Sequence, residues 1–451
     1  MNKLFSLLLG VTLTLVTLSC KEPTEVVNPG GSGKPSTDKP TARPGKVYTV
    51  GKPLGNATTT TIGPQGGKLT SADERLTITV PAGAVETAQT FSIQPISSTG
   101  PQSLGAGFRL APHGTTFKKP VTITVRYDPA LLLGTVAEAL SLAYQNSKGV
   151  WVLAATSKVN TDAHTLSVET THFSDWSVLQ RAVLMPEVGF VKPGGNLVLS
   201  VNLLTEDLLV PIVQDTDVPE PFESPSTVVD YSTWKLAGEG KLVPAAFKAS
   251  YTAPSVPPAR NPVAISIKLN GPTVIDGKPY KELWLVSNVY IGAEGLTYRI
   301  NGGKWVHTLS GAGAQLLSTA GGAFVSINTG GTDSGNLSGV NIQAYPPLVE
   351  SEVGTDNLLT YKTFVQPWRL EGFPSFNLSD KAGELMYLHQ YRVGRVLYAS
   401  PGALSFYRFG PVGDYVIGKF ELEKAGVLYP GKEMSESTVR IEGFFRIKRT
   451  K

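Results

Sequence analysis

Residues 76–80 read Leu-Thr-Ile-Thr-Val, with an apolar side chain at every second position. Residues 121–126, Val-Thr-Ile-Thr-Val-Arg, repeat this pattern, and residues 439–448 follow it near the end of the chain. Because side chains alternate between the two faces of a β-strand, each segment predicts a strand with one buried face and one polar face. This is typical of antiparallel sheets, so we expect an all-β protein.

Glycine and proline are frequent, with 47 and 33 copies among 451 residues, and they favour short strands joined by turns. The best helix candidate is residues 130–140, which Gly134 interrupts. Asn301-Gly302 predicts a tight hairpin between strands near residues 298–300 and 305–307. The length is sufficient for two to four domains, and we expect three consecutive antiparallel domains of sandwich or barrel-like form.

The formal net charge of +4 is spread along the chain without a block of lysine or arginine. Nucleic-acid binding needs clustered positive charge, so we expect no nucleic-acid partner. The sequence also contains no recognised cofactor motif, and we expect no cofactor.

Cys20 is the single cysteine in the chain, and a lone cysteine in an exported protein needs a reason. It follows Lys3 and an apolar run, residues 4–18, which is short for a membrane span. Residues 16–20, Val-Thr-Leu-Ser-Cys, resemble the bacterial lipobox, although Thr17 stands where that motif usually has leucine. The resemblance implies that residues 1–19 are a lipoprotein signal peptide and that Cys20 carries lipid. The alternative is an ordinary secretory signal with an incidental cysteine.

Residues 20–56 are rich in Pro, Gly, Ser, Thr and Lys, a composition that predicts a flexible, disordered linker after the lipidated Cys20. A flexible chain of about 35 residues has an r.m.s. reach of about 30–35 Å. We therefore expect a protein anchored in membrane lipid through acylated Cys20. The expected location is the bacterial outer membrane, on its periplasmic or cell-surface face.

Four segments between residues 57 and 180 resemble the ZU-five domain, the β-sandwich module of ankyrins, zonula occludens proteins and netrin receptors. They are residues 66–69, 76–85, 112–121 and 171–176, in the order found in that family. Residues 183–292, with Trp234 ahead of Gly238-Glu239-Gly240, look like a bacterial immunoglobulin-like sandwich. Residues 293–451 resemble a small C-terminal β domain of bacterial lipoproteins, calycin-like or a sandwich, which implies no mechanism.

The chain lacks the residue patterns of a conventional enzyme. None of the five histidines has a metal-ligand spacing, and no nucleophile elbow occurs in a strand-turn-helix context. We expect no metal site and no turnover. The expected function is non-catalytic: β-sandwich modules presented for protein binding, adhesion or scaffolding, with a protein or envelope partner.

One triplet, His172-Phe173-Ser174, suggests a different function. In some members of the ZU-five family the peptide between phenylalanine and serine of this triplet is cut by the protein itself. The Ser174 hydroxyl would attack the Phe173 carbonyl while His172 removes the proton. On an extended strand the backbones of His172 and Ser174 lie about 6.6 Å apart, so cleavage needs a local kink. The alternative is that Phe173 packs in the core.

Aromatic side chains in the third block suggest a further alternative, a glycan-binding accessory lipoprotein, because sugar rings stack on exposed aromatic faces. Trp305, Trp368 and Tyr391 are the candidate binding residues, with a groove expected between Trp368 and Tyr391. The opposing interpretation is that these rings fill the core of a domain that has no disulfides.

Overall fold

The computed structural model describes residues 47–154, 156–204, 229–269, 273–275, 278–280, 283–308, 312–319, 322–330, 339–345, 364–379 and 384–451. Regular structure within these ranges is β-strand apart from two short 3-10 helices, which confirms the all-β prediction. The predicted signal peptide, Cys20 and residues 21–46 of the predicted linker lie outside the described residues. Residues 47–56 of that predicted linker are described, and the Tyr48 and Leu54 amides donate to the carbonyls of Gly149 and Pro95 in the first sandwich.

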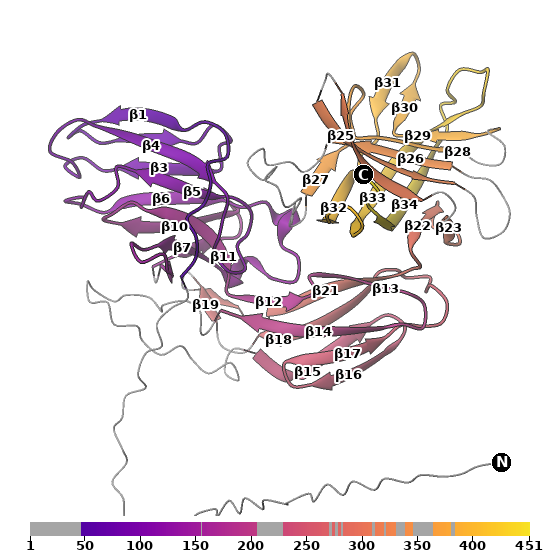
Figure 1. The fold of residues 1–451 in the computed structure, drawn as a ribbon, viewed down its shortest axis with the longest axis horizontal. Coiled ribbons are helices and arrows are strands. Elements are labelled where there is room, and N and C mark those ends of the chain that lie inside the picture. Colours follow the sequence, from indigo (N-terminus) through magenta and orange to yellow (C-terminus); the bar gives the residue numbers. More distant parts are fainter. Residues whose placement is uncertain are drawn as a thin grey trace, which may run out of the picture. The chain divides into compact units, whose positions relative to one another are not determined.

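Residues 58–180 form two antiparallel sheets that share one core (Figure 1). The first sheet has the order β1-β4-β5-β11-β7-β8. Its strands are β1 (Thr58–Ile62), β4 (Gln89–Ile96), β5 (Gly107–Ala111), β7 (Leu140–Gln145), β8 (Trp151–Leu153) and β11 (Asp175–Gln180). The second sheet has the order β2-β3-β6-β10-β9, from β2 (Gly67–Thr70), β3 (Leu76–Val80), β6 (Val121–Arg126), β9 (Lys158–Asn160) and β10 (Thr165–Thr170).

The alternating sequences explain which face of each strand is buried in this sandwich. Strands β3 and β6 have the bounds that the alternation predicts. Leu76 and Ile78 are fully buried in the core, while Thr77 on the opposite face pairs with Thr124 across the sheet. Apolar burial of this kind contributes about 25 cal/mol per Å² and is the main stabilising contribution in a fold without disulfides.

The helix candidate, residues 130–140, is wrong as a single helix. The segment holds two 3-10 turns, Pro129–Leu131 and Ala137–Ala139, separated by Gly134 at φ +67°. A Cβ atom at Gly134 would lie 2.5 Å from the carbonyl oxygen of Leu184. Because this position combines a left-handed backbone with a close approach, it needs glycine and ends the helical path.

Residues 182–291 form a second sandwich. One sheet has the order β12-β14-β17-β16, from β12 (Ala182–Met185), β14 (Asn196–Leu203), β16 (Lys241–Ala245) and β17 (Lys248–Thr252). The other has the order β13-β21-β18-β15, from β13 (Val188–Val191), β15 (Val229–Ala237), β18 (Val263–Leu269) and β21 (Leu283–Ile291). Strands β13 and β21 run parallel, unlike the antiparallel pairs around them. A separate hairpin consists of β19 (Thr273–Ile275) and β20 (Lys278–Tyr280).

Trp234 lies in the core of this second sandwich, as expected for an immunoglobulin-like domain. It is 8% exposed, and its indole N–H donates to the Ala246 carbonyl at 2.9 Å. The hydrogen bond satisfies the one polar atom of a large buried side chain, which stabilises its position between the sheets.

Residues 295–448 form one large curved sheet of eleven strands, a half-barrel. The main path is β23-β22-β34-β33-β29-β28-β26-β25-β24, and β32 pairs with both β27 and β33. The strands are β22 (Gly295–Ile300), β23 (Val306–Thr308), β24 (Gly313–Thr319), β25 (Gly322–Thr329), β26 (Gly339–Ala344), β27 (Phe364–Pro367), β28 (Ser375–Ser379), β29 (Met386–Leu388), β32 (Ala403–Phe409), β33 (Tyr415–Leu428) and β34 (Thr438–Lys448). A separate hairpin consists of β30 (Gln390–Val393) and β31 (Val396–Ala399).

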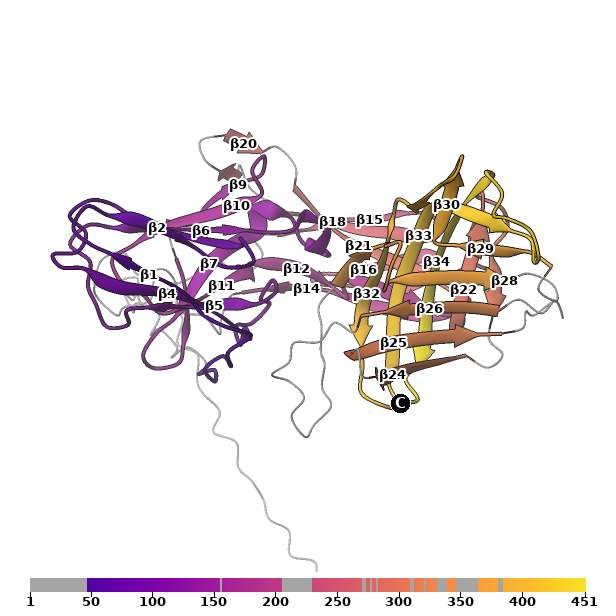
Figure 2. The ribbon, with the colours of Figure 1, turned by 90° about the horizontal axis from the view of Figure 1, so that it is seen from above.

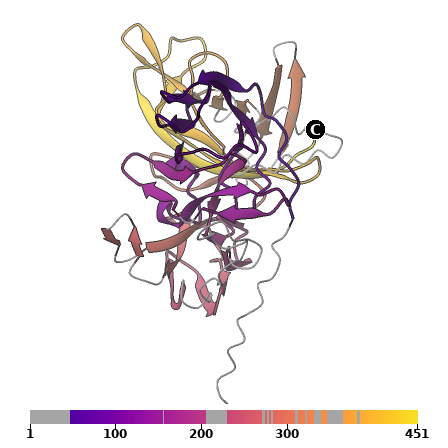
Figure 3. The ribbon, with the colours of Figure 1, turned by 90° about the vertical axis from the view of Figure 1, so that its left-hand side faces the viewer.

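One end of this sheet's order, β24, is hydrogen-bonded to the residues that follow β34 at the end of the chain. The Thr450 amide donates to the Ala314 carbonyl, and the Leu316 amide donates to the Lys451 carbonyl, both at 2.8 Å. Figure 2 shows the resulting curvature, with the long strands β33 and β34 crossing β25, β26 and β28. The strands of each sandwich, and those of the large curved sheet, come from one continuous part of the chain, as the colour sequence shows in Figure 3.

The hairpin predicted at Asn301-Gly302 is present between β22 and β23, with both residues at positive φ. Its loop is longer than the tight turn that the sequence predicts, because strand pairing starts only at Tyr298 and Val306. Asn301 is bonded to another strand instead: its amide donates to the Arg440 carbonyl, and its side-chain oxygen accepts from the Arg440 amide.

Candidate functional site

The triplet His172-Phe173-Ser174 lies in the connection from β10 to β11. Phe173 is 3% exposed and packs edge-on against Phe117 and Phe91, with ring centroids 4.7 and 5.8 Å away. Aromatic pairs of this geometry stabilise a core beyond their buried area. The middle residue of the triplet is therefore a core residue of the first sandwich.

The two polar members of the triplet contact different groups. The Ser174 hydroxyl donates to the carbonyl oxygen of Gln145 on β7. The His172 ring lies 3.3 Å from the Thr170 hydroxyl through Nδ1 and contacts the Tyr144 ring at a centroid distance of 4.7 Å. The proton that self-cleavage would remove thus takes part in a hydrogen bond to the backbone.

We predict that the chain does not cut itself. Attack on the Phe173 carbonyl would require the Ser174 hydroxyl to leave its acceptor and the backbone to kink beside a tightly packed ring. The purified chain should run as one band on a denaturing gel, identical to a Ser174→Ala variant. Fragments that end at Phe173 and start at Ser174, present in the parent chain and absent from the variant, would contradict this.

Asp175 follows the triplet and forms an ion pair inside the first sheet. Its carboxylate accepts two hydrogen bonds from Arg109, from Nε and Nη2, each at 2.8 Å. Asp175 is 4% exposed, and this bidentate contact raises the pKa of the Arg109 guanidinium. Two-point contacts of this kind fix geometry as well as charge, so Asp175 anchors β11 to β5.

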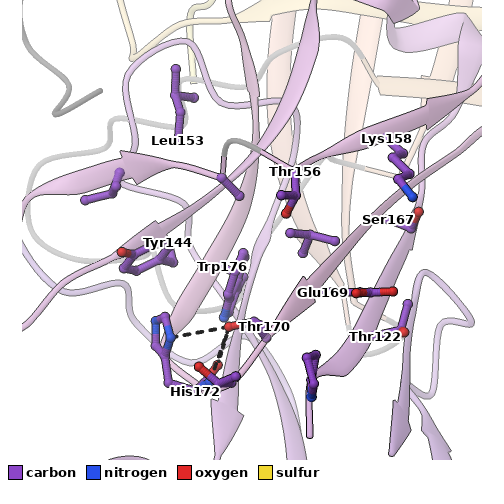
Figure 4. A pocket seen from close by; sticks show the side chains of 15 residues that line it. Thr122, Tyr144, Leu153, Thr156, Lys158, Ser167, Glu169, Thr170, His172 and Trp176 are labelled. Atoms are coloured by element: carbon purple, nitrogen blue, oxygen red, sulfur yellow. Dashed lines mark hydrogen bonds between the residues drawn. The ribbon is translucent and has the colours of Figure 1, made fainter. Parts of the chain in front are cut away.

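A recess of about 810 Å³ opens beside the triplet, at one edge of the first sandwich. One side is lined by Tyr144, His172 and Trp176, and the other by Thr122, Lys158, Ser167 and Glu169 (Figure 4). Its volume is in the range of sites that bury small ligands. The recess is larger than two other concavities of the first sandwich, of about 520 and 380 Å³, and we take it as the candidate functional site.

The polar wall comes from three neighbouring strands of the second sheet. Glu169 on β10 pairs with Thr122 on β6, and Ser167 on β10 pairs with Lys158 on β9. Strand β9 pairs with β10 only along Thr165–Ser167, so the rest of β10 has no described strand on that side. The recess lies along this short unpaired stretch because β9 begins only at Lys158, opposite Ser167.

The aromatic wall comes from the other sheet and from the β10–β11 connection. The Tyr144 ring contacts both His172 and Trp176, at centroid distances of 4.7 and 5.3 Å. Trp176 is 1% exposed, and its indole N–H is buried without a hydrogen-bond partner. Buried donors without partners are rare in folded proteins, and this one lies in the wall of the recess.

A second concavity of about 520 Å³ shares Tyr144 and His172 with the first. Arg109, Ser174 and Asp175 also line it. The triplet predicted from sequence is therefore adjacent to both concavities, and His172 lines each of them.

The rings of Trp368 and Trp305 are covered by other parts of the protein. Trp368 is 4% exposed, and its indole N–H donates to the Glu421 carbonyl at 2.7 Å, so it belongs to the core. Trp305 is half-buried beneath the Arg299 guanidinium, 4.3 Å from its ring centroid. Its indole N–H donates to the Pro258 carbonyl at 3.1 Å.

Tyr391 is half-buried and lies on the β30–β31 hairpin. Its ring stacks on Tyr398 at 5.6 Å, and the Lys424 ammonium lies 5.4 Å from its centroid. Tyr398 is 44% exposed. The three candidates for glycan binding therefore differ in their surroundings. Trp368 and Trp305 make structural hydrogen bonds, and Tyr391 belongs to a stacked aromatic pair.

Of the residues that line the recess, the sequence predicted His172 as a site residue but none of the polar wall. Thr122, Ser167 and Glu169 appear in the sequence as the polar face of ordinary amphipathic strands, and alternation alone cannot distinguish a flat polar face from a concave one. The one sequence feature that points to Ser167 and Glu169 is that their strand, β10, leads into His172.

The described residues contain no group of three or more His, Cys, Asp or Glu side chains arranged to hold a metal ion. None of their helices is long and apolar enough to cross a bilayer.

The sequence matches no protein-family model and no curated protein. The fold defines the class: a modular all-β protein with two sandwiches followed by a curved eleven-stranded sheet. The resemblance to ZU-five and immunoglobulin-like domains stays a prediction from the motifs.

Proposed function

We propose that this chain is a non-catalytic, lipid-anchored envelope protein that presents its β modules to an envelope partner and binds it in the recess of the first sandwich. The observation that carries the proposal is the recess, whose two walls differ in chemistry and come from opposite sheets. Concave sites with convergent polar groups are the usual places for ligands.

The composition of the recess favours binding over turnover. Glu169 is the one carboxylate among its described lining residues, whereas acid–base hydrolysis of a glycoside uses two. The nearby Ser174 hydroxyl is bonded to a backbone carbonyl, and Asp175 is bonded to Arg109. These groups stabilise the fold around the recess and position its aromatic wall.

The proposed location is the outer membrane, on its periplasmic or cell-surface face, with lipid on Cys20. Adhesion and scaffolding are the roles that sandwich modules with such an anchor serve by analogy. A protein or glycan of the envelope would be within reach of a module on a flexible linker.

Site-specific photocrosslinking in intact cells tests this function. Thr156 is exposed at the rim of the recess, and its replacement with benzoylphenylalanine should yield a crosslinked envelope component. The matched control places the same group at exposed Thr61 on β1, the opposite edge of the first sheet from β8. Equal adducts from both positions, or none from Thr156, would reject the recess as the binding site.

A further inference from the structure

We propose that the hairpin β30–β31 inserts one apolar face into the interfacial layer of the bilayer to which the chain is anchored. The inference rests on the lipid anchor of the proposed function and adds a second contact with the same membrane. It does not involve the recess of the first sandwich. Figure 1 shows the hairpin projecting from one end of the curved sheet.

The hairpin exposes large apolar side chains that lie next to one another. They are 42–57% exposed, and they are Val393, Val396, Leu397 and Tyr398. Single exposed apolar residues are ordinary on a protein surface, whereas contiguous ones rimmed by polar groups mark interaction sites. Burying them against another apolar phase contributes about 25 cal/mol per Å². The hairpin therefore gains free energy when its tip is covered.

Strand pairing places most of these side chains on one face. Tyr391 pairs with Tyr398, and Val393 pairs with Val396 across a two-residue turn. Because alternate residues of a strand share a face, both pairs lie on the same face of the hairpin. The two tyrosine rings stack on each other, so this face has valines near the turn and an aromatic pair behind them.

The opposite face holds the hairpin on the module. Arg392 lies on that face and forms an ion pair with Glu433. The Gly394 amide at the turn donates to the Glu436 carboxylate at 3.1 Å. Both acids belong to the connection from β33 to β34. A two-stranded hairpin is marginally stable alone, so these contacts keep it folded while its apolar face remains exposed.

The composition of the exposed face suits a bilayer interface. Arg395 is exposed at the turn, and the Lys424 ammonium lies 5.4 Å from the Tyr391 ring centroid. Long cationic side chains keep their charge among the headgroups while their methylenes lie deeper, and tyrosine is enriched at the same depth. Near a membrane with anionic lipids, each such cation adds about 1 kcal/mol. Lysine is by contrast depleted from the cores of protein interfaces, so a bilayer fits this face better than a protein partner does.

The predicted anchor brings this face to a membrane. Residues 21–46 separate Cys20 from the first described pairing, and a flexible linker of that length has an r.m.s. reach of about 25–30 Å. A second contact on a tethered molecule works at an effective concentration on the order of millimolar. A hairpin that binds only marginally by itself can therefore stay inserted while the anchor is present. Without the anchor it should be too weak to hold the chain on the membrane.

Quenching by spin-labelled lipid tests the inference. The lipidated full chain carries Val396→Cys labelled with the fluorophore NBD, which is possible because acylation blocks the thiol of Cys20, the one native cysteine. It is reconstituted into vesicles of phosphatidylethanolamine and phosphatidylglycerol, with or without doxyl-labelled lipid. Doxyl lipid should lower the NBD emission by about twofold or more, because an interfacial segment lies about 5–10 Å deep at the boundary of headgroups and acyl chains. Adding Val393→Asp, which places a charge in the apolar face, should abolish most of the quenching. Adding Val393→Thr instead, which keeps the β-branched shape of valine, should reduce it less.

The matched control is Val412→Cys with the same label. Val412 is a 54% exposed valine of the same module in the turn before β33, whereas the hairpin contacts the far end of β33 near Gly426. A strand of this length separates the two positions by about 35 Å, so the control should show little quenching. Equal quenching at both positions, or none at Val396, would overturn the inference. A Val396 label that is shielded from aqueous iodide but not quenched by doxyl lipid would show a protein partner or a second copy on this face, and would overturn it too.

Incorporation of labelled palmitate into the same chain separates this inference from the proposed function. With palmitate present and no quenching at Val396, the insertion fails, while the anchor and a crosslinked partner at Thr156 still support the proposed function. Without palmitate, the anchor fails and the insertion fails with it.

Discussion

Phe173→Ala is expected to destabilise the first sandwich by about 3–5 kcal/mol, the range for removing a fully buried phenylalanine. Phe173 joins Phe91 and Phe117 in a three-ring cluster between the two sheets, and all three side chains are 3% exposed or less. Alanine leaves a cavity that neighbouring β-strands cannot fill, because their positions are fixed by pairing on both sides.

Denaturant unfolding followed by tryptophan fluorescence measures this effect. Trp151 and Trp176 report on the first sandwich, and each is 1% exposed or less. Because the chain has several modules, the transition of the first sandwich is analysed separately from the others. Phe247→Ala, at a position 49% exposed, is the control and should change stability by less than about 0.5 kcal/mol. A loss below about 1 kcal/mol for Phe173→Ala would show that the ring is not part of the core.

The size of this effect decides how the triplet is interpreted. If Phe173 served self-cleavage, the backbone at this residue would have to kink locally. If its ring packs in the core, it contributes several kcal/mol to the free energy of unfolding. The ring contacts of Phe173 and the hydrogen bond from Ser174 to the Gln145 carbonyl both favour packing.

The strands could be predicted where the alternation of side chains is strict. β3 and β6 match the predicted segments residue for residue, and β34 differs from its segment by a single residue at the start. Alternation succeeds here because each strand buries one face against a shared core and exposes the other. The parallel pairing of β13 with β21 was not predictable in this way, since alternation specifies faces and not neighbours.

The errors in the fold occurred where tertiary contacts override local preference. Residues 130–140 have helical composition, yet Gly134 must approach the backbone of Leu184 and adopts a left-handed conformation. The loop at Asn301 is longer than its turn signal indicates because Asn301 bonds to Arg440, which is far away in sequence. Neither contact has a signal in the local sequence.

The candidate site was only partly accessible from sequence. The motif around His172 lies at the corner of the first sandwich where the recess opens. The recess itself depends on β9 beginning only at Lys158, which is a matter of sheet topology. Aromatic content was a poor guide: Trp368 is a core residue, while Tyr144, which no motif singled out, lines the recess. Aromatic residues fill cores more often than they form platforms in domains without disulfides.

Cys20→Ser should release the chain from the membrane. If the thiol of Cys20 carries diacylglycerol, two or three acyl chains hold the protein, and each buried methylene contributes about 0.8 kcal/mol. One acyl chain gives only marginal binding, whereas two or more make the attachment effectively permanent. Loss of all of them should lower the ratio of membrane-bound to soluble protein by more than about a hundredfold. Fractionation of a bacterial host by ultracentrifugation measures this ratio, and incorporation of labelled palmitate measures the lipid itself.

Ser19→Ala is the matched control, because it keeps a small residue beside Cys20 and should leave both readouts unchanged. The folded part provides a second control. Its first described pairing, Val47 with Val150, begins well beyond Cys20, so released Cys20→Ser protein should unfold at the same denaturant concentration as the anchored chain. Cys20→Ser protein that still sediments with membranes would mean that another part of the chain binds them. An unmodified Cys20 thiol in the parent chain would remove the envelope location on which the proposed function depends.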